Sequence, residues 1–455
     1  MRKRLHLDRE FYGKLVRLTL PISLQSLMLA AVAAGDAVML GRVEQNAMAA
    51  VSLATQVQFV QNMILMAVTS AGSILAAQYW GKGDRRTVND IFCMMLRAAG
   101  LASLLFFGAC VLVPELLMRV FAHDPELVRI GAGYLKIAGW SYLLTGVSQC
   151  YLTIMKVSEH ADRSAWISSG AVIVNILLNA VFIFGLLGAP AMGANGAALA
   201  TLVARVLELA AAVLSSRRAD FISPEWKRLF HRSRLLAADF RRCCLPLLGG
   251  ALFWGVGFTS YTAIMGHLGE DAAAANAVAA VVRDLICCLC NGIEAAGGIL
   301  VGNELGAGQL EKGRLYGNRL AKLSFAIAFL STAIVLLVTP FVVRFMIMND
   351  TARSYLTGML VITSIYMIGR TVNTVIINGI FAAGGDTLFD MYSLAVCMWG
   401  IAIPLALLGA FALRWPVLVV YGCTCLDEVG KIPWVMAHYR KYKWVKDLTR
   451  EDVEG

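Results

Sequence analysis

Two stretches of the chain, GSILAAQYWGKG at residues 72–83 and GGILVGNELGAG at residues 297–308, share a pattern of glycines and apolar residues 225 positions apart. The same shift of the sequence, without gaps, places Pro21 on Pro246. Self-similarity at a fixed spacing is the mark of a repeated structural unit. The sequence therefore predicts two similar halves.

The composition indicates a membrane protein. Of the 455 residues, 58% are hydrophobic and only 15% are charged, whereas soluble domains have about 25% charged residues. One membrane span needs about 20 mostly apolar residues, so roughly 38 residues per helix and connection give about twelve spans. The net charge of +10 lies mainly in short loops, where it reports orientation in the membrane. Nucleic acid is therefore not an expected partner.

Apolar stretches between helix breakers predict six spans in each half. They fall near residues 15–39, 47–80, 91–113, 129–157, 163–187 and 193–216, and then near 241–265, 271–305, 317–346, 351–383, 388–412 and 415–439. The predicted organisation is an N-terminal six-helix bundle (1–216), a linker (217–240), a C-terminal six-helix bundle (241–439) and a tail (440–455).

Lysine and arginine are concentrated in loops on the same side as the N-terminus, including the linker and the tail. Positive loops face the cytoplasm, so both termini are expected there. An even number of spans per half gives the halves one orientation, as a parallel pseudo-two-fold repeat, which is typical of alternating-access carriers. We find no P-loop, HExxH motif or nucleophile elbow. We therefore expect neither an enzyme nor a bound cofactor.

Charged residues inside a span are costly and often functional. Asp36 lies near the outer end of the first span, where a poorly hydrated carboxylate can exchange a proton or a sodium ion. The alternative is an aspartate that is solvated at the membrane interface. Pro21, in the same span, permits a helix kink, which is either functional or static. In the second half Tyr261 stands at the position of Asp36.

Other polar residues within spans offer further candidates. Asn175 and Asn179 are one helical turn apart and share a face, and Thr201 follows on the next span. These three side chains either bind a cation or hold neighbouring helices together. In the second half, Glu294 either binds a substrate cation or is neutralised by Arg283. Asp390 is expected near the membrane interface.

The order of several motifs resembles one family over nearly the whole chain. The motifs are Asp36 to Arg42 with Ala47 to Ala50, Gly81 to Asp84, Asn175 to Asn179 with Phe184 and Gly185, Gly193 to Ala198, Gly302 to Gly308, and Gly379 to Thr387 with Trp399 and Pro404. Together they resemble the MATE (multidrug and toxic compound extrusion) transporters of bacteria. The resemblance implies twelve helices in two bundles that form a V, and export of bulky cationic or amphipathic molecules by antiport with Na+ or H+.

The resemblance also assigns roles to residues. The cation-coupling site falls on Asp36, Asn175, Asn179 and Thr201, with Na+ as a candidate ion at the first three, and the helix-bending proline falls on Pro21. Many members have a glutamate in the seventh span, where this chain reads Leu248 to Ala251, and an aspartate near Leu394. Both carboxylates are absent. We take Glu294 and Asp390 as candidate substitutes, for a substrate or for a proton.

Two rival functions remain open. One is a lipid-linked oligosaccharide flippase of the same superfamily, which usually has extra helices or a strongly cationic cavity. The other is a transport-inactive sensor or scaffold, for which Asp36 would be dispensable. The expected setting is a monomer that crosses the cell membrane several times, in contact with the lipid bilayer and with a small-molecule substrate.

Overall fold

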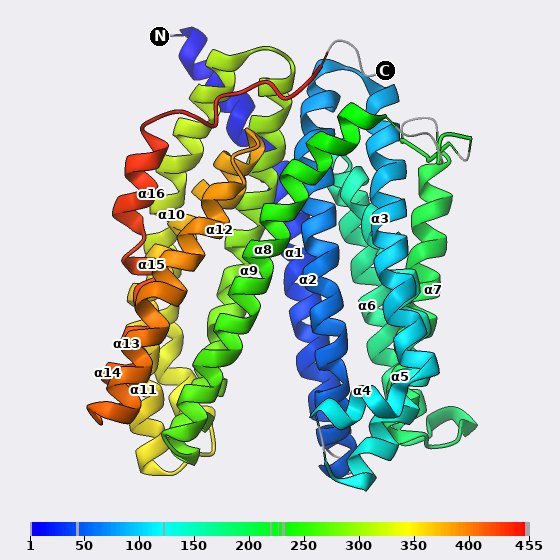
Figure 1. The fold of residues 1–455 in the computed structure, drawn as a ribbon, viewed down its shortest axis with the longest axis vertical. Helices are drawn as coiled ribbons and strands as arrows, with labels where there is room; N and C mark the ends of the chain where they lie inside the picture. The colour runs from blue at the N-terminus through cyan, green and yellow to red at the C-terminus, as the bar shows by residue number, and fades with distance from the viewer. Residues whose placement is uncertain are drawn as a thin grey trace. The chain divides into compact units, whose positions relative to one another are not determined.

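The computed structural model describes residues 2–41, 45–121, 123–218, 221–225, 227–229 and 233–450. Within these ranges the chain is helical apart from turns and short irregular segments, and no β-strand occurs (Figure 1). Ten of the described helices are long and apolar enough to cross a membrane. The predicted all-α membrane fold is confirmed.

The helices follow the chain in two series. The first series is α1 (Arg2–Gly41), α2 (Gln45–Lys82), α3 (Arg85–Leu112), α4 (Pro114–Phe121), α5 (Pro125–Val157), α6 (Ala161–Phe184), the 3₁₀ turn η1 (Leu186–Gly188) and α7 (Gly193–Ser216). The second series is α8 (Arg234–His267), α9 (Glu270–Gly306), α10 (Leu310–Phe345), α11 (Asp350–Asn373), α12 (Leu388–Leu394), α13 (Ile403–Leu407), α14 (Val417–Thr424), α15 (Leu426–Val429) and α16 (Ile432–Tyr439), with π-helical segments η2 (Thr374–Phe381), η3 (Ala395–Ala402) and η4 (Leu408–Ala412).

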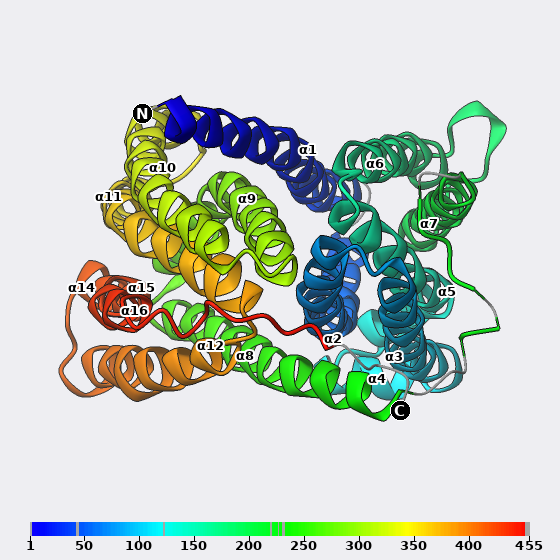
Figure 2. The ribbon, with the colours of Figure 1, turned by 90° about the horizontal axis from the view of Figure 1, so that it is seen from above.

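These helices form two compact units. The C-terminal unit contains Met1–Ser23, Ala77–Gly83 and Arg241–Arg450, and the N-terminal unit contains Leu24–Ala76 and Asp84–Phe240. In the N-terminal unit α5 packs against α3 and α7, and α7 packs against α6 (Figure 2). In the C-terminal unit α11 packs against α9 and α10. The beginning of α1 and the end of α2 thus belong with the second series of helices.

The end of α2 crosses the end of α9 at two glycines. A Cβ atom at Gly81 would collide with the carbonyl oxygen of Asn303, and a Cβ atom at Gly306 would collide with that of Gln78. Only glycine permits so close a backbone approach. Because both residue pairs are related by the shift of 225, the two contacts are equivalent in the repeat. The pattern that defines the repeat therefore encodes a specific helix crossing.

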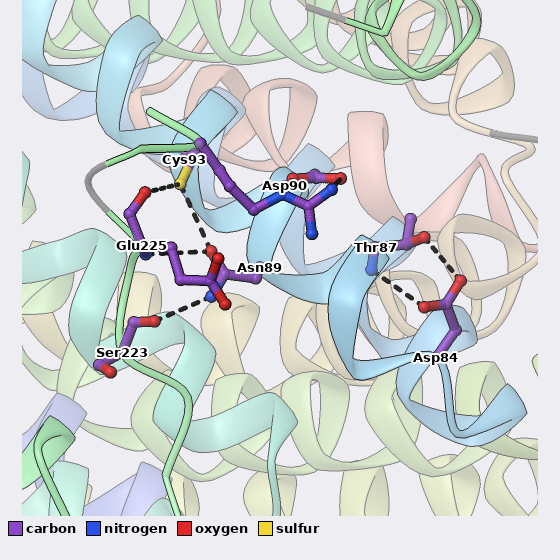
Figure 3. Close-up of polar contacts among 8 residues, drawn as sticks. Asp84, Thr87, Asn89, Asp90, Cys93, Ser223 and Glu225 are labelled. Carbon is purple, nitrogen blue, oxygen red and sulfur yellow. Dashed lines mark hydrogen bonds and ion pairs between the residues drawn. The ribbon is translucent and has the colours of Figure 1, made fainter. Parts of the chain in front are cut away.

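The loop between the two series is fastened to α3 (Figure 3). The Asn89 amide donates to the carbonyl oxygen of Ser223 at 2.9 Å and accepts from the backbone N–H of Glu225 at 3.3 Å. Arg228 forms an ion pair with Asp90, with 3.1 Å between Nε and Oδ1. The described part of the predicted linker is thus a docked segment.

The region of the predicted twelfth span is not one continuous helix. It divides into α14, α15 and α16, with a break at Gly430. Pro433 lies in the first turn of α16, where its missing N–H costs no helix hydrogen bond. The predicted span near 415–439 thus consists of three short helices that follow one another directly along the chain.

The predicted tail packs against the C-terminal unit. Trp444 is fully buried, and Cβ atoms at Gly317 and Gly384 would collide with it. The side-chain amide of Gln78 donates to the carbonyl oxygen of Lys446 at 3.2 Å and accepts from the N–H of Leu448 at 2.6 Å. These contacts fix the chain after α16 against the end of α2.

Candidate functional site

Asn175, Asn179 and Thr201 form a hydrogen-bonded group in the N-terminal unit, which we call the amide cluster. Nδ2 of Asn179 donates to Oδ1 of Asn175 at 3.2 Å. Nδ2 of Asn175 donates in turn to Oγ1 of Thr201 at 3.1 Å. The Thr201 hydroxyl donates to the carbonyl oxygen of Ala197 at 3.0 Å. Both asparagines are buried, so the structure brings together the three polar residues that the sequence singled out on α6 and α7.

The close packing of α6 and α7 explains this geometry. A Cβ atom at Gly196 would lie 2.5 Å from the carbonyl oxygen of Phe182, so the glycine lets the two helices approach. Asn175 and Asn179 are four residues apart and therefore share one face of α6. The amide cluster therefore brings amide and hydroxyl oxygens close together. Such oxygens are ligands suited to hard cations such as Na+.

An ion pair lies further along the same face of α7. Positions 201, 205 and 208 share one side of an α-helix, since they are spaced by four and three residues. Nη1 of Arg205 lies 2.5 Å from Oε2 of Glu208, and the Glu208 side chain is only 1% exposed. Arg205 is therefore ion-paired within its own helix. Glu208 was not among the residues predicted from the sequence, although its charge within a span was a usable signal.

Asp36 and Pro21 both lie in α1. The helix continues through Pro21, which is half-buried. The Asp36 side chain lies outside the described residues. The role assigned to Asp36 stays a prediction.

The C-terminal unit contains a buried group of charges centred on Glu428. Oε1 of Glu428 lies 3.2 Å from Nη1 of Arg370, and its Oε2 lies 3.3 Å from Nζ of Lys431. The Asn373 amide donates to Oε2 at 2.7 Å. Gly369 lets α11 approach α15, because a Cβ atom there would lie 2.6 Å from the carbonyl oxygen of Glu428. The carboxylate is thus surrounded by donors from two helical segments.

Two more carboxyl groups, those of Asp427 and Asp390, lie close to Glu428 and its two cationic partners. Asp427 is 3% exposed and lies near the hydroxyl of Tyr261. Asp390 is half-buried on α12 and lies within electrostatic range of Lys431, Glu428 and Arg370. We call Arg370, Asp390, Asp427, Glu428 and Lys431 the charge cluster.

The charge cluster was only partly foreseen. Asp390 was predicted from the sequence as a candidate, but Asp427 and Glu428 were not. These two residues lie with Lys431 in the segment CLDEVGK at 425–431. Three charged residues within one five-residue segment of an otherwise apolar stretch were a usable signal. The cluster holds two cationic and three carboxyl side chains, so binding one proton or one monovalent cation would balance its charge.

Asp390 occupies the space that Gly250 leaves open. A Cβ atom at Gly250 would lie 2.7 Å from Oδ2 of Asp390. Gly250 belongs to the stretch where related sequences were expected to have a glutamate on the seventh span. A carboxyl group from α12 therefore lies against α8 at that level, in place of one carried by α8 itself.

Glu294 is half-buried on α9, where its backbone packs against Gly379 of η2. The suggested neutralisation of Glu294 by Arg283 is wrong. Arg283 pairs with Asp284, with 2.9 Å between Nη2 and Oδ1. Eleven residues separate Arg283 from Glu294 on the same helix, a distance of about 16 Å along its axis.

Comparison with known proteins places this architecture among transporters. The family model MatE matches residues 21–181 and 246–408. The two matches begin at Pro21 and Pro246, which reproduces the shift of 225 residues. The chain is 22% identical to the uncharacterized transporter YisQ of Bacillus subtilis over 442 residues, covering 96% of each chain. It is 27% identical to the multidrug resistance protein NorM of Burkholderia vietnamiensis over 423 residues, covering 88% of each.

Solved structures show the same fold. The MATE transporter VcmN of Vibrio cholerae in its bent form superposes with a TM-score of 0.85 at 15% identity, covering 96% of this chain and 98% of VcmN. A MOP superfamily transporter from Pyrococcus furiosus also gives a TM-score of 0.85, at 17% identity, covering 94% of this chain and 95% of that one.

Proposed function

Because the chain belongs to the MatE family of multidrug efflux transporters, we propose that it is a secondary active antiporter and not an enzyme. It exports bulky cationic or amphipathic small molecules through alternating access, driven by Na+ or H+ entry, and it needs no cofactor. It acts as a monomer in the cell membrane with both termini in the cytoplasm. The observation that supports this most directly is the buried amide cluster between α6 and α7.

The amide cluster suits reversible binding of a small cation. Its oxygens belong to uncharged groups, so a bound Na+ would take its charge balance from a carboxylate, and the family resemblance assigns that role to Asp36. Binding would replace the hydrogen bond between Asn175 and Thr201 by oxygen coordination. A proton would act differently, because it would neutralise the Asp36 carboxylate and leave the amide hydrogen bonds in place. Either event changes the polar contacts that α1, α6 and α7 can make.

The C-terminal unit supplies a second candidate for coupling. We propose that Asp390 takes the place of the missing seventh-span glutamate, since its carboxyl group lies over Gly250. When Asp390 gains or loses a proton, its charge changes, and this change alters the electrostatic energy of the other residues in the charge cluster. Glu294 is kept as the alternative position for this role.

The decisive experiment compares Asp36→Asn with Asp162→Asn in proteoliposomes. Asp162 is exposed in the first turn of α6, so it controls for the same chemical change outside the site. Efflux of a fluorescent organic cation is measured under a Na+ gradient and, separately, under a pH gradient. Asp36→Asn should abolish gradient-driven efflux with normal folding, and Asp162→Asn should leave it intact. Full transport by Asp36→Asn would refute the coupling role and favour the sensor or scaffold alternative.

A further inference from the structure

A cavity in the C-terminal unit has no role in the coupling scheme above. It is partly open, with about 410 Å³ of empty volume when the adjoining open space is included, and it lies among α8, α9, α11 and α14. The wall is aromatic and polar, with Phe258, Tyr261, Arg283, Tyr366 and Tyr421 among the lining residues. Tyr261 is the repeat equivalent of Asp36. At this position the second half thus has a hydroxyl group beside a cavity where the first half has a carboxyl group.

Arg283 is the only charged residue among the described residues that line the cavity. Its guanidinium lies 4.4 Å from the ring centroid of Phe258, and Phe258 stacks on Trp254 at 5.3 Å. This stack holds the cationic group in a fixed position. The side chain of Arg283 is 13% exposed, whereas that of its partner Asp284 is 64% exposed. The cation is therefore held in the wall while its counter-ion lies toward the outside.

Arg283 has hydrogen-bonding capacity to spare. Nε and Nη2 both donate to Oδ1 of Asp284, at 3.0 and 2.9 Å. Nη1 makes no hydrogen bond with any residue that the structure describes. The fork of a guanidinium matches the two oxygens of a carboxylate, so the remaining donors suit an anionic ligand group.

Tyr261 provides a second polar atom. The residue is nine-tenths buried, and its hydroxyl meets no partner at hydrogen-bonding geometry among the described residues, although Asp427 lies nearby. A buried hydroxyl without a hydrogen-bond partner is unfavourable. A ligand that accepts a hydrogen bond from this group would remove that cost.

We propose that this cavity binds the carboxylate group of an aromatic anionic or zwitterionic molecule. Arg283 and Tyr261 hold the carboxylate, and the rings of Tyr366 and Tyr421 contact the aromatic part. A purely cationic ligand is disfavoured, because it would face Arg283 without a neutralising group in the lining. The proposal rests on the proposed exporter function and narrows its substrate class for the C-terminal unit.

The test is equilibrium binding to the full chain in lipid nanodiscs, with no ion gradient. The probes are 2-naphthoate and 2-naphthylmethylammonium, which share one ring system and differ in charge. The wild-type protein should bind the carboxylate about tenfold more tightly than the amine. Arg283→Gln should weaken carboxylate binding about tenfold and leave amine binding unchanged. Arg344→Gln removes an exposed arginine at the end of α10 and should change neither affinity.

Two further variants make the test independent of how well Arg283→Gln folds. Asp284→Asn frees the guanidinium from its counter-ion and should raise carboxylate affinity several-fold. Tyr261→Phe should lower carboxylate affinity several-fold, because it removes the hydroxyl that would donate to the ligand. Equal wild-type affinities for the two probes, or unchanged carboxylate binding in all these variants, would overturn the proposal.

The same binding assay separates this proposal from the exporter function. Asp36 belongs to the N-terminal unit and the cavity to the C-terminal unit, so the Asp36→Asn protein should bind 2-naphthoate as the wild type does. Carboxylate-selective binding by a wild-type protein that shows no gradient-driven efflux would refute only the exporter function. Intact cation efflux without carboxylate selectivity would refute only the cavity assignment.

Discussion

The amide cluster and the charge cluster stand in the two halves of one repeat, yet they are built from different chemistry. The amide cluster is uncharged and held by hydrogen bonds of 3.1–3.2 Å between neutral side chains. The charge cluster has Glu428 in contact with Arg370 and Lys431, all largely removed from solvent. The two glycine contacts between α2 and α9 are equivalent in the repeat, whereas the charged residues of the two clusters are not. A repeated backbone architecture therefore leaves each half free to acquire its own electrostatics.

The strongest way to sharpen this comparison is Glu428→Ala. The substitution removes the carboxylate that contacts both Arg370 and Lys431, and breaking a buried ion pair in this way costs about 3–5 kcal/mol. The free energy of unfolding, measured by SDS titration of the purified protein, should fall by that amount. The control is Glu126→Ala, which removes an exposed partner of Arg129 and should cost roughly 0–1 kcal/mol. Similar values for the two variants would mean that the charge cluster is solvated.

A pair of asparagines gives an intermediate effect. Asn373→Ala removes a donor to the charged Glu428 and should cost about 1.5–3 kcal/mol, whereas Asn175→Ala breaks bonds between neutral groups and should cost about 1 kcal/mol. The same SDS titration measures both. Asn175→Ala should nevertheless show the larger loss of ion-dependent efflux, measured per amount of folded protein. A reversed order of efflux losses would move the coupling site to the charge cluster.

The smallest effect is expected at the two prolines of the repeat. Pro21→Ala and Pro246→Ala each restore a helix hydrogen-bond donor and relieve the same ring clash, so their effects on helix stability should be similar. If α1 rearranges during coupling, Pro21→Ala should lower gradient-driven efflux of a bulky cation several-fold, and Pro246→Ala should change it much less. Equal losses at both positions would indicate that the prolines are only architectural.

Much of the architecture followed from local properties of the sequence. Apolar stretches of sufficient length specify membrane helices, because hydrocarbon cannot hydrogen-bond an exposed backbone. The 225-residue repeat indicated two related halves, and the spacing of Asn175 and Asn179 placed both amides on one face. Each of these inferences depends on residues close together in the chain or on a repeated pattern.

Contacts between distant segments were decided by the tertiary structure. No local pattern tells that Glu428 pairs with Arg370, 58 positions earlier, or that Asp390 lies over Gly250. Such pairings depend on how each helix is rotated about its axis and how closely a glycine lets its neighbour approach. The cavity around Arg283 is of the same kind, since its wall comes from helices far apart in the sequence. Hydropathy specifies that a segment is a helix, whereas side-chain packing between helices decides which polar groups meet.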